Sequence, residues 1–115
     1  MSKSEHRIQD EIRLALSHHG IVIRLNSGRA YGGNRVWDPK RNQYILTDIR
    51  PIALAVKGTP DLLFLGENGN VVFIEVKDDK GRVRLEQQRF IEIMHNMGIK
   101  AGVCRSVEGA LELIK

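Results

Sequence analysis

The spacing of hydrophobic residues along the chain predicts three helices. Apolar side chains recur one helical turn apart over residues 4–19 and 85–97, which is typical of helices that bury one face, and a short third helix is predicted over residues 107–114. Gly20 and Gly98 follow the first two segments, and glycine commonly ends a helix. Ser106 stands directly before the third segment, where a serine side chain can cap the first turn.

Short apolar runs between these helices predict strands, at residues 21–25, 62–65, 71–76 and 100–104. The second and third runs flank a turn over residues 66–70 and predict a hairpin. Both are apolar on both faces, as expected of central strands covered on each side. A further hairpin is predicted from Arg35–Trp37 and Gln43–Thr47 around the five-residue loop Asp38–Asn42. We therefore expect an α/β fold in which helices flank a mixed sheet.

Length and composition predict one intracellular domain. The 115 residues are enough for a single core, so we expect one domain over residues 1–115. The lone Cys104 can form no intramolecular disulfide, and the chain begins without an apolar signal segment, which favours a reducing, cytoplasmic setting. No apolar run approaches the length that spans a membrane, so no membrane partner is expected.

The positive charge is concentrated in residues 27–57. This segment has six basic residues against two acids, which equals the net charge of +4 of the whole chain, and it contains every Tyr and Trp. Basic groups interleaved with flat rings favour nucleic-acid binding. The alternative is a solvated loop whose aromatic residues anchor it to the core. The candidate nucleic-acid contacts in the segment are Arg29, Tyr31, Arg35, Trp37, Lys40, Arg41 and Lys57.

Three charged residues interrupt the predicted core hairpin. Asp61 precedes its first strand, while Glu75 and Lys77 lie at the end of its second strand on one face. Burying an unpaired carboxylate is costly, so a purely structural strand would carry an aliphatic residue at position 75. Antiparallel pairing brings Asp61 close to Glu75, and together with the Val76 carbonyl they form an oxygen donor set that suits Mg²⁺ or Mn²⁺. Such a metal would activate a water to attack a phosphodiester, with Lys77 assisting as a cation.

Polar residues inside apolar helical stripes point to the same site. Gln87 lies within the buried stripe of the second predicted helix, and Glu5 and Gln9 lie within that of the first. Each residue has a structural alternative. Gln87 can bond a core carbonyl, Glu5 can complete a capping box with Ser2, Asp61 can close the preceding turn, and Glu75 with Lys77 can form an exposed edge-strand pair.

These motifs resemble those of a known nuclease family. The chain has Gly-Thr-Pro-Asp61, then Ile-Glu75-Val-Lys77, then Arg84-Leu-Glu-Gln87, and this series is similar to the VRR-NUC (virus-type replication-repair nuclease) family of the PD-(D/E)XK superfamily. The resemblance implies a restriction-endonuclease-like fold, Mg²⁺- or Mn²⁺-dependent phosphodiester hydrolysis, and kinship with Holliday junction resolvases. It implies catalytic roles for Asp61, Glu75, Lys77 and Gln87. The first-helix position is filled by either Glu5 or Gln9.

The combined expectation is an endonuclease that cuts branched or structured DNA in replication, repair or recombination. Symmetric cutting of a four-way junction needs two sites, so a homodimer is expected. Arg82 and Arg84, ahead of the second helix, join the candidate DNA contacts, although the family often has Ser at position 84. A phage or prophage origin fits the resemblance. The alternatives are a non-catalytic DNA-binding module of the same fold and a sequence-specific restriction-type nuclease.

Overall fold

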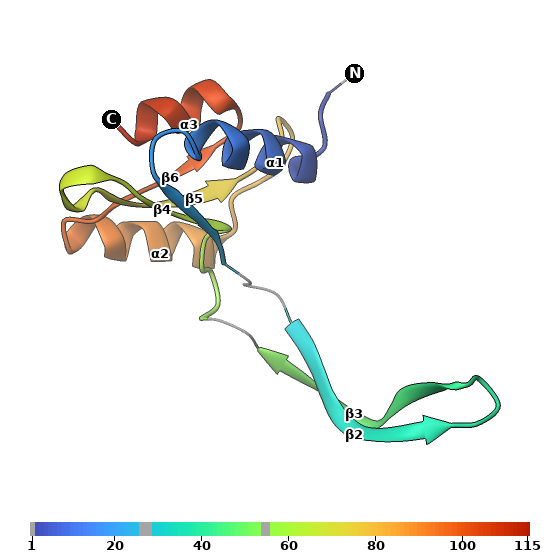
Figure 1. Cartoon of the computed structure of the whole chain (residues 1–115). Helices are drawn as coiled ribbons and strands as arrows, with labels where there is room; N and C mark the ends of the chain where they lie inside the picture. Colours follow the sequence, from blue (N-terminus) through green and yellow to red (C-terminus); the bar gives the residue numbers. More distant parts are fainter. Residues whose placement is uncertain (1, 26–28, 54–55) are drawn as a thin grey trace.

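A computed structural model describes residues 2–25, 29–53 and 56–115 and shows a body with one protruding arm (Figure 1). The body contains a four-stranded sheet in the order β1-β4-β5-β6, made by β1 (Ile21–Arg24), β4 (Leu62–Leu65), β5 (Val71–Val76) and β6 (Lys100–Cys104). Strands β1, β4 and β5 pair antiparallel, and β6 runs parallel to β5. The expected mixed sheet flanked by helices is therefore confirmed.

The helices lie on both faces of this sheet. Helices α1 (Glu5–Leu16) and α3 (Val107–Leu113) cover one face, and α2 (Leu85–Asn96) lies on the other (Figure 1). Helix α2 ends at Asn96, and the positive φ of 77° at Gly98 allows the Ile99 N–H to reach the Met94 carbonyl. The Ser106 side chain caps α3 as predicted. The N-cap of α1 is Ser4, which accepts from the Arg7 N–H, so the alternative in which Glu5 completes a capping box with Ser2 is wrong.

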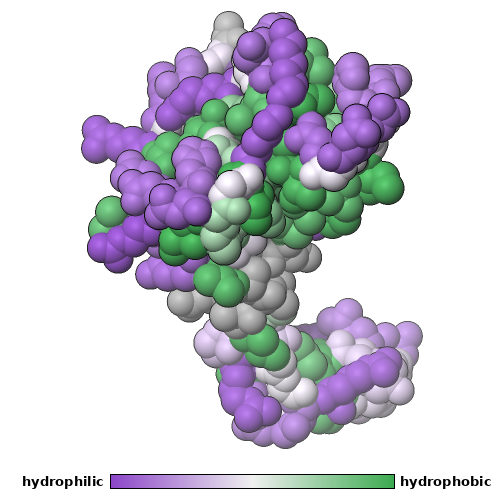
Figure 2. Space-filling model, turned by 90° about the vertical axis from the view of Figure 1, so that its left-hand side faces the viewer, coloured by the Kyte–Doolittle hydropathy of each residue, from purple (hydrophilic) through white to green (hydrophobic). Residues whose placement is uncertain are grey.

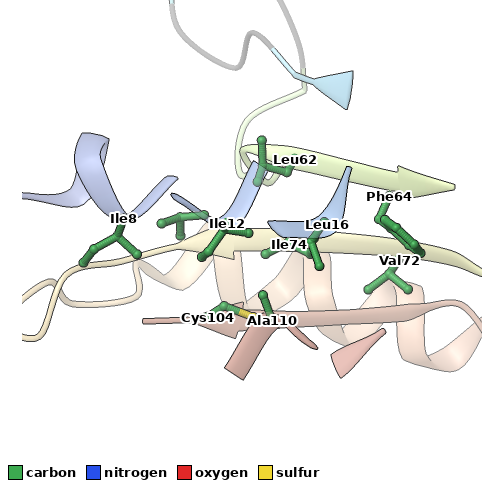
Figure 3. Packing of buried hydrophobic residues seen from close by; sticks show 10 residues of the cluster. Ile8, Ile12, Leu16, Leu62, Phe64, Val72, Ile74, Cys104 and Ala110 are labelled. Carbon is green, nitrogen blue, oxygen red and sulfur yellow. The ribbon is translucent and has the colours of Figure 1, made fainter. Parts of the chain in front are cut away.

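The hydrophobic core fills the space between the four-stranded sheet and the helices α1 and α3. Alternate residues of β4 and β5 point into it, together with one face of α1 and residues of β6 and α3 (Figure 3). Its buried members are Ile8, Ile12, Leu16, Leu62, Phe64, Val72, Ile74, Val76, Cys104 and Ala110. The intervening strand residues point toward α2, where Phe73 packs against Phe90 with ring centroids 5.5 Å apart. A short 3₁₀ turn, η1 (Glu67–Gly69), connects β4 and β5.

The arm is a second, two-stranded sheet formed by β2 (Arg29–Asp38) and β3 (Gln43–Ala53). The expected loop is present, but both strands are longer than predicted, because pairing continues past a bulge opposite Gly33. The arm projects from the body (Figure 1), and the chain extends over 54 × 34 × 30 Å with a radius of gyration of 17.5 Å. A compact chain of this length has a radius of gyration of about 13 Å. No helix among the described residues is long and apolar enough to cross a membrane.

Candidate active site

Three carboxylates meet where β4 begins and β5 ends. Asp61 immediately precedes β4, and because Leu62 pairs with Ile74, its carboxylate reaches β5, where Oδ2 accepts the Val76 N–H at 2.8 Å. Glu75 is the penultimate residue of β5, and Glu5 lies in the first turn of α1. Carboxylate oxygens of Glu5, Asp61 and Glu75 lie within 4.8 Å of one another. The structure thus brings together residues from three separate elements.

Glu75 is a buried carboxyl group in an electrostatically unfavourable position. Its exposed fraction is 2%, and its Oε2 is buried with no hydrogen-bond partner in the described part of the chain. Burial, followed by the neighbouring Asp61 carboxylate, raises the pKa of Glu75 to about 8, although Lys77 acts in the opposite direction. A bound cation would relieve both the repulsion and the missing contact.

Gln87 and Lys77 hold the other oxygen of Glu75. The Gln87 Nε2 donates to Glu75 Oε1 at 2.9 Å, and the Gln87 Oε1 accepts the Arg84 N–H at 2.9 Å, which fixes the orientation of the amide. The Lys77 Nζ lies 3.7 Å from the same Glu75 oxygen. The side chain of Lys77 is 10% exposed, so its ammonium group is largely removed from contact with water.

The residues present fit a divalent metal. Glu5, Asp61 and Glu75 offer carboxylate oxygens, which are preferred ligands of hard cations such as Mg²⁺ and Mn²⁺. The unpartnered Glu75 Oε2 is a free donor in a buried place, where polar atoms are normally satisfied. The first-helix carboxylate that joins Asp61 and Glu75 is Glu5. Gln9 is buried one turn further along α1, and its Oε1, like Glu75 Oε2, has no hydrogen-bond partner among the described residues.

The structure also places a residue that sequence reasoning missed. Arg105 donates through one guanidinium nitrogen to the carbonyls of Asp78 and Gly81, at 2.5 and 2.8 Å, and so fastens the loop that follows Lys77. Gly81 of this loop packs closely against the aliphatic part of the Lys77 side chain. A Cβ at position 81 would lie 3.2 Å from Lys77 Cδ. The parallel pairing of Val76 with Cys104, which puts residue 105 beside residue 77, is the signal that would have found Arg105.

The structural alternatives for the site residues are largely resolved. β5 is an interior strand and both Glu75 and Lys77 are buried, so the exposed edge-pair interpretation is wrong. Gln87 donates to Glu75 rather than to a core carbonyl. Asp61 contacts Val76 on the neighbouring strand rather than only closing its own turn.

The basic and aromatic candidates lie mainly on the arm. Tyr31, Trp37 and Tyr44 are 64%, 48% and 55% exposed, so the interpretation that they anchor a loop to the core is wrong. The Trp37 and Tyr44 rings meet edge to face at 5.1 Å, and the Arg35 guanidinium lies 3.7 Å from the Tyr44 ring centroid. Lys40 and Arg41 occupy the turn, and Lys57, Arg82 and Arg84 are exposed elsewhere. The side chain of Arg29 lies outside the described part of the structure.

The arm leaves the body beside the carboxylates. The Leu25 N–H, at the last residue described before the arm, donates to the Asp61 carbonyl at 2.8 Å. The arm and the carboxylate group are therefore joined through the backbone of Asp61 itself.

Comparisons with known proteins agree with the geometry. The family model of the VRR-NUC domain matches residues 3–108. A solved structure described as a VRR_NUC domain superposes with a TM-score of 0.62 at 21% sequence identity, covering 97% of this chain and 96% of that one. A search of curated proteins finds no match to this chain.

Proposed function

Because the chain belongs to the VRR-NUC domain family, a family of nuclease-type DNA-processing folds, we propose that it is a metal-dependent endonuclease that hydrolyses phosphodiester bonds in branched DNA. The observation that carries this proposal is the group formed by Glu5, Asp61 and Glu75 with the buried Lys77 beside it. A site with three acids and a largely desolvated ammonium group suits a reaction in which a cation and a lysine both face a phosphate.

Each residue of the site has a role that follows from its contacts. Glu5, Asp61 and Glu75, with the Val76 carbonyl as a further oxygen donor, would hold Mg²⁺ or Mn²⁺. The metal, when bound, supplies an activated water and neutralises charge on the phosphodiester. Lys77 presents its ammonium group to a phosphate oxygen, where it stabilises developing negative charge. Gln87 orients Glu75 through its Nε2 hydrogen bond.

The arm would bind the DNA backbone and bases. Between residues 29 and 53 the chain has five basic residues and two acids, and exposed aromatic rings lie among them. Arg35, Lys40 and Arg41 can neutralise phosphates, and the exposed rings of Trp37 and Tyr44 can pack on sugars or stack on bases. Lys57, Arg82 and Arg84 would extend this contact across the body.

Paired cuts across a four-way junction require two copies of the site, so we propose that the active species is a homodimer. DNA replication, repair or recombination is the process in which such a substrate arises. We place this activity in the cytoplasm, in a phage or prophage setting, because of the resemblance to virus-type nucleases and the single buried thiol of Cys104.

The deciding experiment compares a labelled four-way junction with matched linear duplex and flap DNA, in Mg²⁺, Mn²⁺ or EDTA. Asp61→Asn and Glu75→Gln keep the shape of each side chain, and Glu92→Gln on the exposed side of α2 is the matched control. We expect metal-dependent junction cutting that falls about a hundredfold or more in the two site variants and is unchanged in the control.

Two other outcomes would replace the proposal. Discrete bands from long linear duplex would indicate a sequence-specific restriction-type nuclease. Salt-dependent binding that Asp61→Asn leaves intact, without cutting of any DNA form, would indicate a non-catalytic DNA-binding module, which the exposed basic and aromatic arm favours as the second candidate.

A further inference from the structure

The two faces of the arm differ in chemistry. Side chains alternate along β2, and the strand register sets which β3 residue shares each face. The aromatic face carries the pairs Trp37–Tyr44 and Arg35–Leu46, and Tyr31 continues it toward the body. The aliphatic face carries Val36–Ile45, Asn34–Thr47, Gly32–Arg50 and Ala30–Ile52. Because the bulge adds its extra residue to β3 alone, both faces run the length of β2.

Within the described residues, no helix or strand packs on the aliphatic face of the arm. Val36 and Ile52 are 44% and 48% exposed on this face, and between them lie Arg50 and the Asn34 amide, which donates to the Asp48 carboxylate at 3.0 Å. An isolated two-stranded hairpin is marginally stable in water, and it gains stability by packing an apolar face against another element. A second layer over this face would therefore stabilise the arm.

The body exposes an apolar face of its own. Ile21 pairs with Leu65 and Ile23 with Leu63, so all four point to the α2 side of the sheet. Helix α2 lies over β5 and β6, where Phe90 meets Phe73 and the His95 ring bonds the Ala101 carbonyl. It leaves the β1 and β4 part of that face uncovered. Figure 2 shows hydrophobic residues gathered over one side of the body.

Helix α2 supplies one wall of this uncovered face. His95 marks the flank of α2 that faces β6. At about 100° per residue, Ile93 and Met97 lie on the opposite flank with Phe90, toward β4 and β1. Both are more than half exposed. The floor of Ile21, Ile23, Leu63 and Leu65 and the wall of Ile93 and Met97 are called the body patch below.

The total surface is large for a chain of this mass. The accessible surface is 8171 Å², and the mass is 13.0 kDa. A compact monomer of that mass exposes about 6,300 Å², so this chain exposes about 1,800 Å² more. A standard interface buries about 800 Å² on each partner. The excess is enough for a stable homodimer.

We propose that the aliphatic face of the arm packs on the body patch of a second copy of this chain, in a reciprocal exchange of arms. A ribbon face about 34 Å long and 10 Å wide covers about 340 Å². Contact between two arms alone would thus fall well short of a standard interface. Reciprocal exchange buries two such areas on every protomer, one on the arm and one on the body patch. The buried area then approaches that of a standard interface.

Charge selects which face of the arm meets the second copy. The arm carries a net positive charge, with Arg35 on the aromatic face and Lys40 and Arg41 at the turn beyond it. Packing the aliphatic faces inward leaves the aromatic faces of both arms open to a polyanion and separates their charges. The same arrangement closes by two-fold symmetry, so no free patch remains to form filaments.

The test measures mass by light scattering over a dilution series in EDTA and without DNA, so that it is independent of the nuclease proposal. The arm variant is Val36→Thr with Ile52→Thr, and its control on the aromatic face is Tyr44→Thr with Leu46→Thr, where exposure is similar. The body variant is Ile23→Thr with Ile93→Gln. Its control is Leu14→Gln on α1, where a leucine that is 69% exposed lies on the other side of the sheet. Circular dichroism checks that each variant is folded.

We expect wild type at twice the 13.0 kDa chain mass. The arm and body variants should each raise the dissociation constant about tenfold or more, with both controls unchanged. A monomeric wild type would overturn the proposal. So would a body variant that stays as dimeric as wild type, because the arms would then pack elsewhere, and so would dissociation caused by the aromatic-face control. Loss of nuclease activity with dimerisation intact would contradict the proposed function alone.

Discussion

At the scale of single residues, the most informative side chain is Glu75. It is buried beside Asp61 and Glu5, and one of its oxygens has no partner in the described chain. Such a carboxylate lowers the stability of the metal-free protein and is the group that gains most from a cation. The same features that make Glu75 costly to fold therefore make it a strong candidate ligand.

Glu75→Gln should stabilise the metal-free protein and remove its response to metal. We expect the free energy of unfolding to rise by about 1–2 kcal/mol, because a neutral amide replaces a crowded carboxyl group while Gln87 can still donate to its oxygen. Thermal unfolding with and without Mn²⁺ checks both effects. Glu92→Gln, on exposed α2 surface, is the control. A variant that kept the full Mn²⁺-induced shift would show that Glu75 is not a ligand.

Cys104 should give the protein a pH-dependent stability at alkaline pH. Burial raises the pKa of this thiol from 9.0 to about 11. Between these values the unfolded chain loses the proton and the folded chain keeps it, so stability falls as pH rises. We expect the difference in unfolding free energy between wild type and Cys104→Ala to shrink by about 1–2 kcal/mol from pH 9 to pH 11. Denaturant titrations at each pH measure it, and a constant difference would contradict the buried thiol.

The site was predictable from the sequence wherever a charge stood in an apolar strand. Asp61, Glu75 and Lys77 violate the hydrophobic pattern, and such a violation is costly enough to require a reason. Glu5 was harder to assign, because a residue near a helix start can serve the cap or a site, and Ser2 and Ser4 both precede it. Only the tertiary position of α1 places the Glu5 carboxylate beside Asp61 and Glu75.

At the scale of elements, the segment before β4 positions Asp61 through a close contact with α2. Gly58 has a φ of 91°, and a Cβ there would lie 2.3 Å from the Glu86 carbonyl oxygen. Glycine is therefore needed both for the backbone conformation and for space. The approach fixes the turn that leads through Pro60 to Asp61, next to the start of the helix that carries Gln87.

Gly58→Ala should therefore destabilise the fold by more than backbone strain alone. Gly69→Ala is the matched control, because Gly69 also has a positive φ, of 72°, but no atom within 4 Å of a Cβ. We expect a loss of about 1 kcal/mol for Gly69→Ala and about 2–4 kcal/mol for Gly58→Ala. Chemical denaturation provides both values. Equal losses would mean that the contact with α2 relaxes freely.

Elements with strong local patterns were predicted well, and the arm strands were not. The body strands are continuous apolar runs, and the helices have caps and glycine stops, so local sequence and tertiary structure agree. In the arm, Gly32, Gly33 and Pro51 lie inside paired strands and weaken every local strand signal. The strand register shifts at the bulge opposite Gly33 and pairing then continues. Short-range periodicity cannot predict such a shift.

At the scale of the whole molecule, the arm and the body are separate in their packing. Every buried residue of the core cluster belongs to body elements, and none belongs to β2 or β3. The sequence pattern could predict a hairpin but not that it stands away from the main sheet, because that arrangement depends on what covers the arm. The body should consequently fold without it.

Replacing residues 26–55 with a Gly-Asn-Gly link tests this division and keeps Val56, whose carbonyl accepts the Thr59 N–H at 3.0 Å. We expect a body that unfolds cooperatively, because its core and the Leu25 hydrogen bond to Asp61 are retained. Binding to a four-way junction should weaken about a hundredfold or more, since the basic and aromatic residues of the arm are lost. Metal-dependent hydrolysis of a small nitrophenyl phosphodiester should persist, because Asp61, Glu75 and Lys77 lie on the body.

Fluorescence anisotropy measures binding to the junction, and absorbance of the nitrophenyl product measures hydrolysis. Junction affinity equal to that of the full chain would show that the DNA surface lies on the body, among Lys57, Arg82 and Arg84.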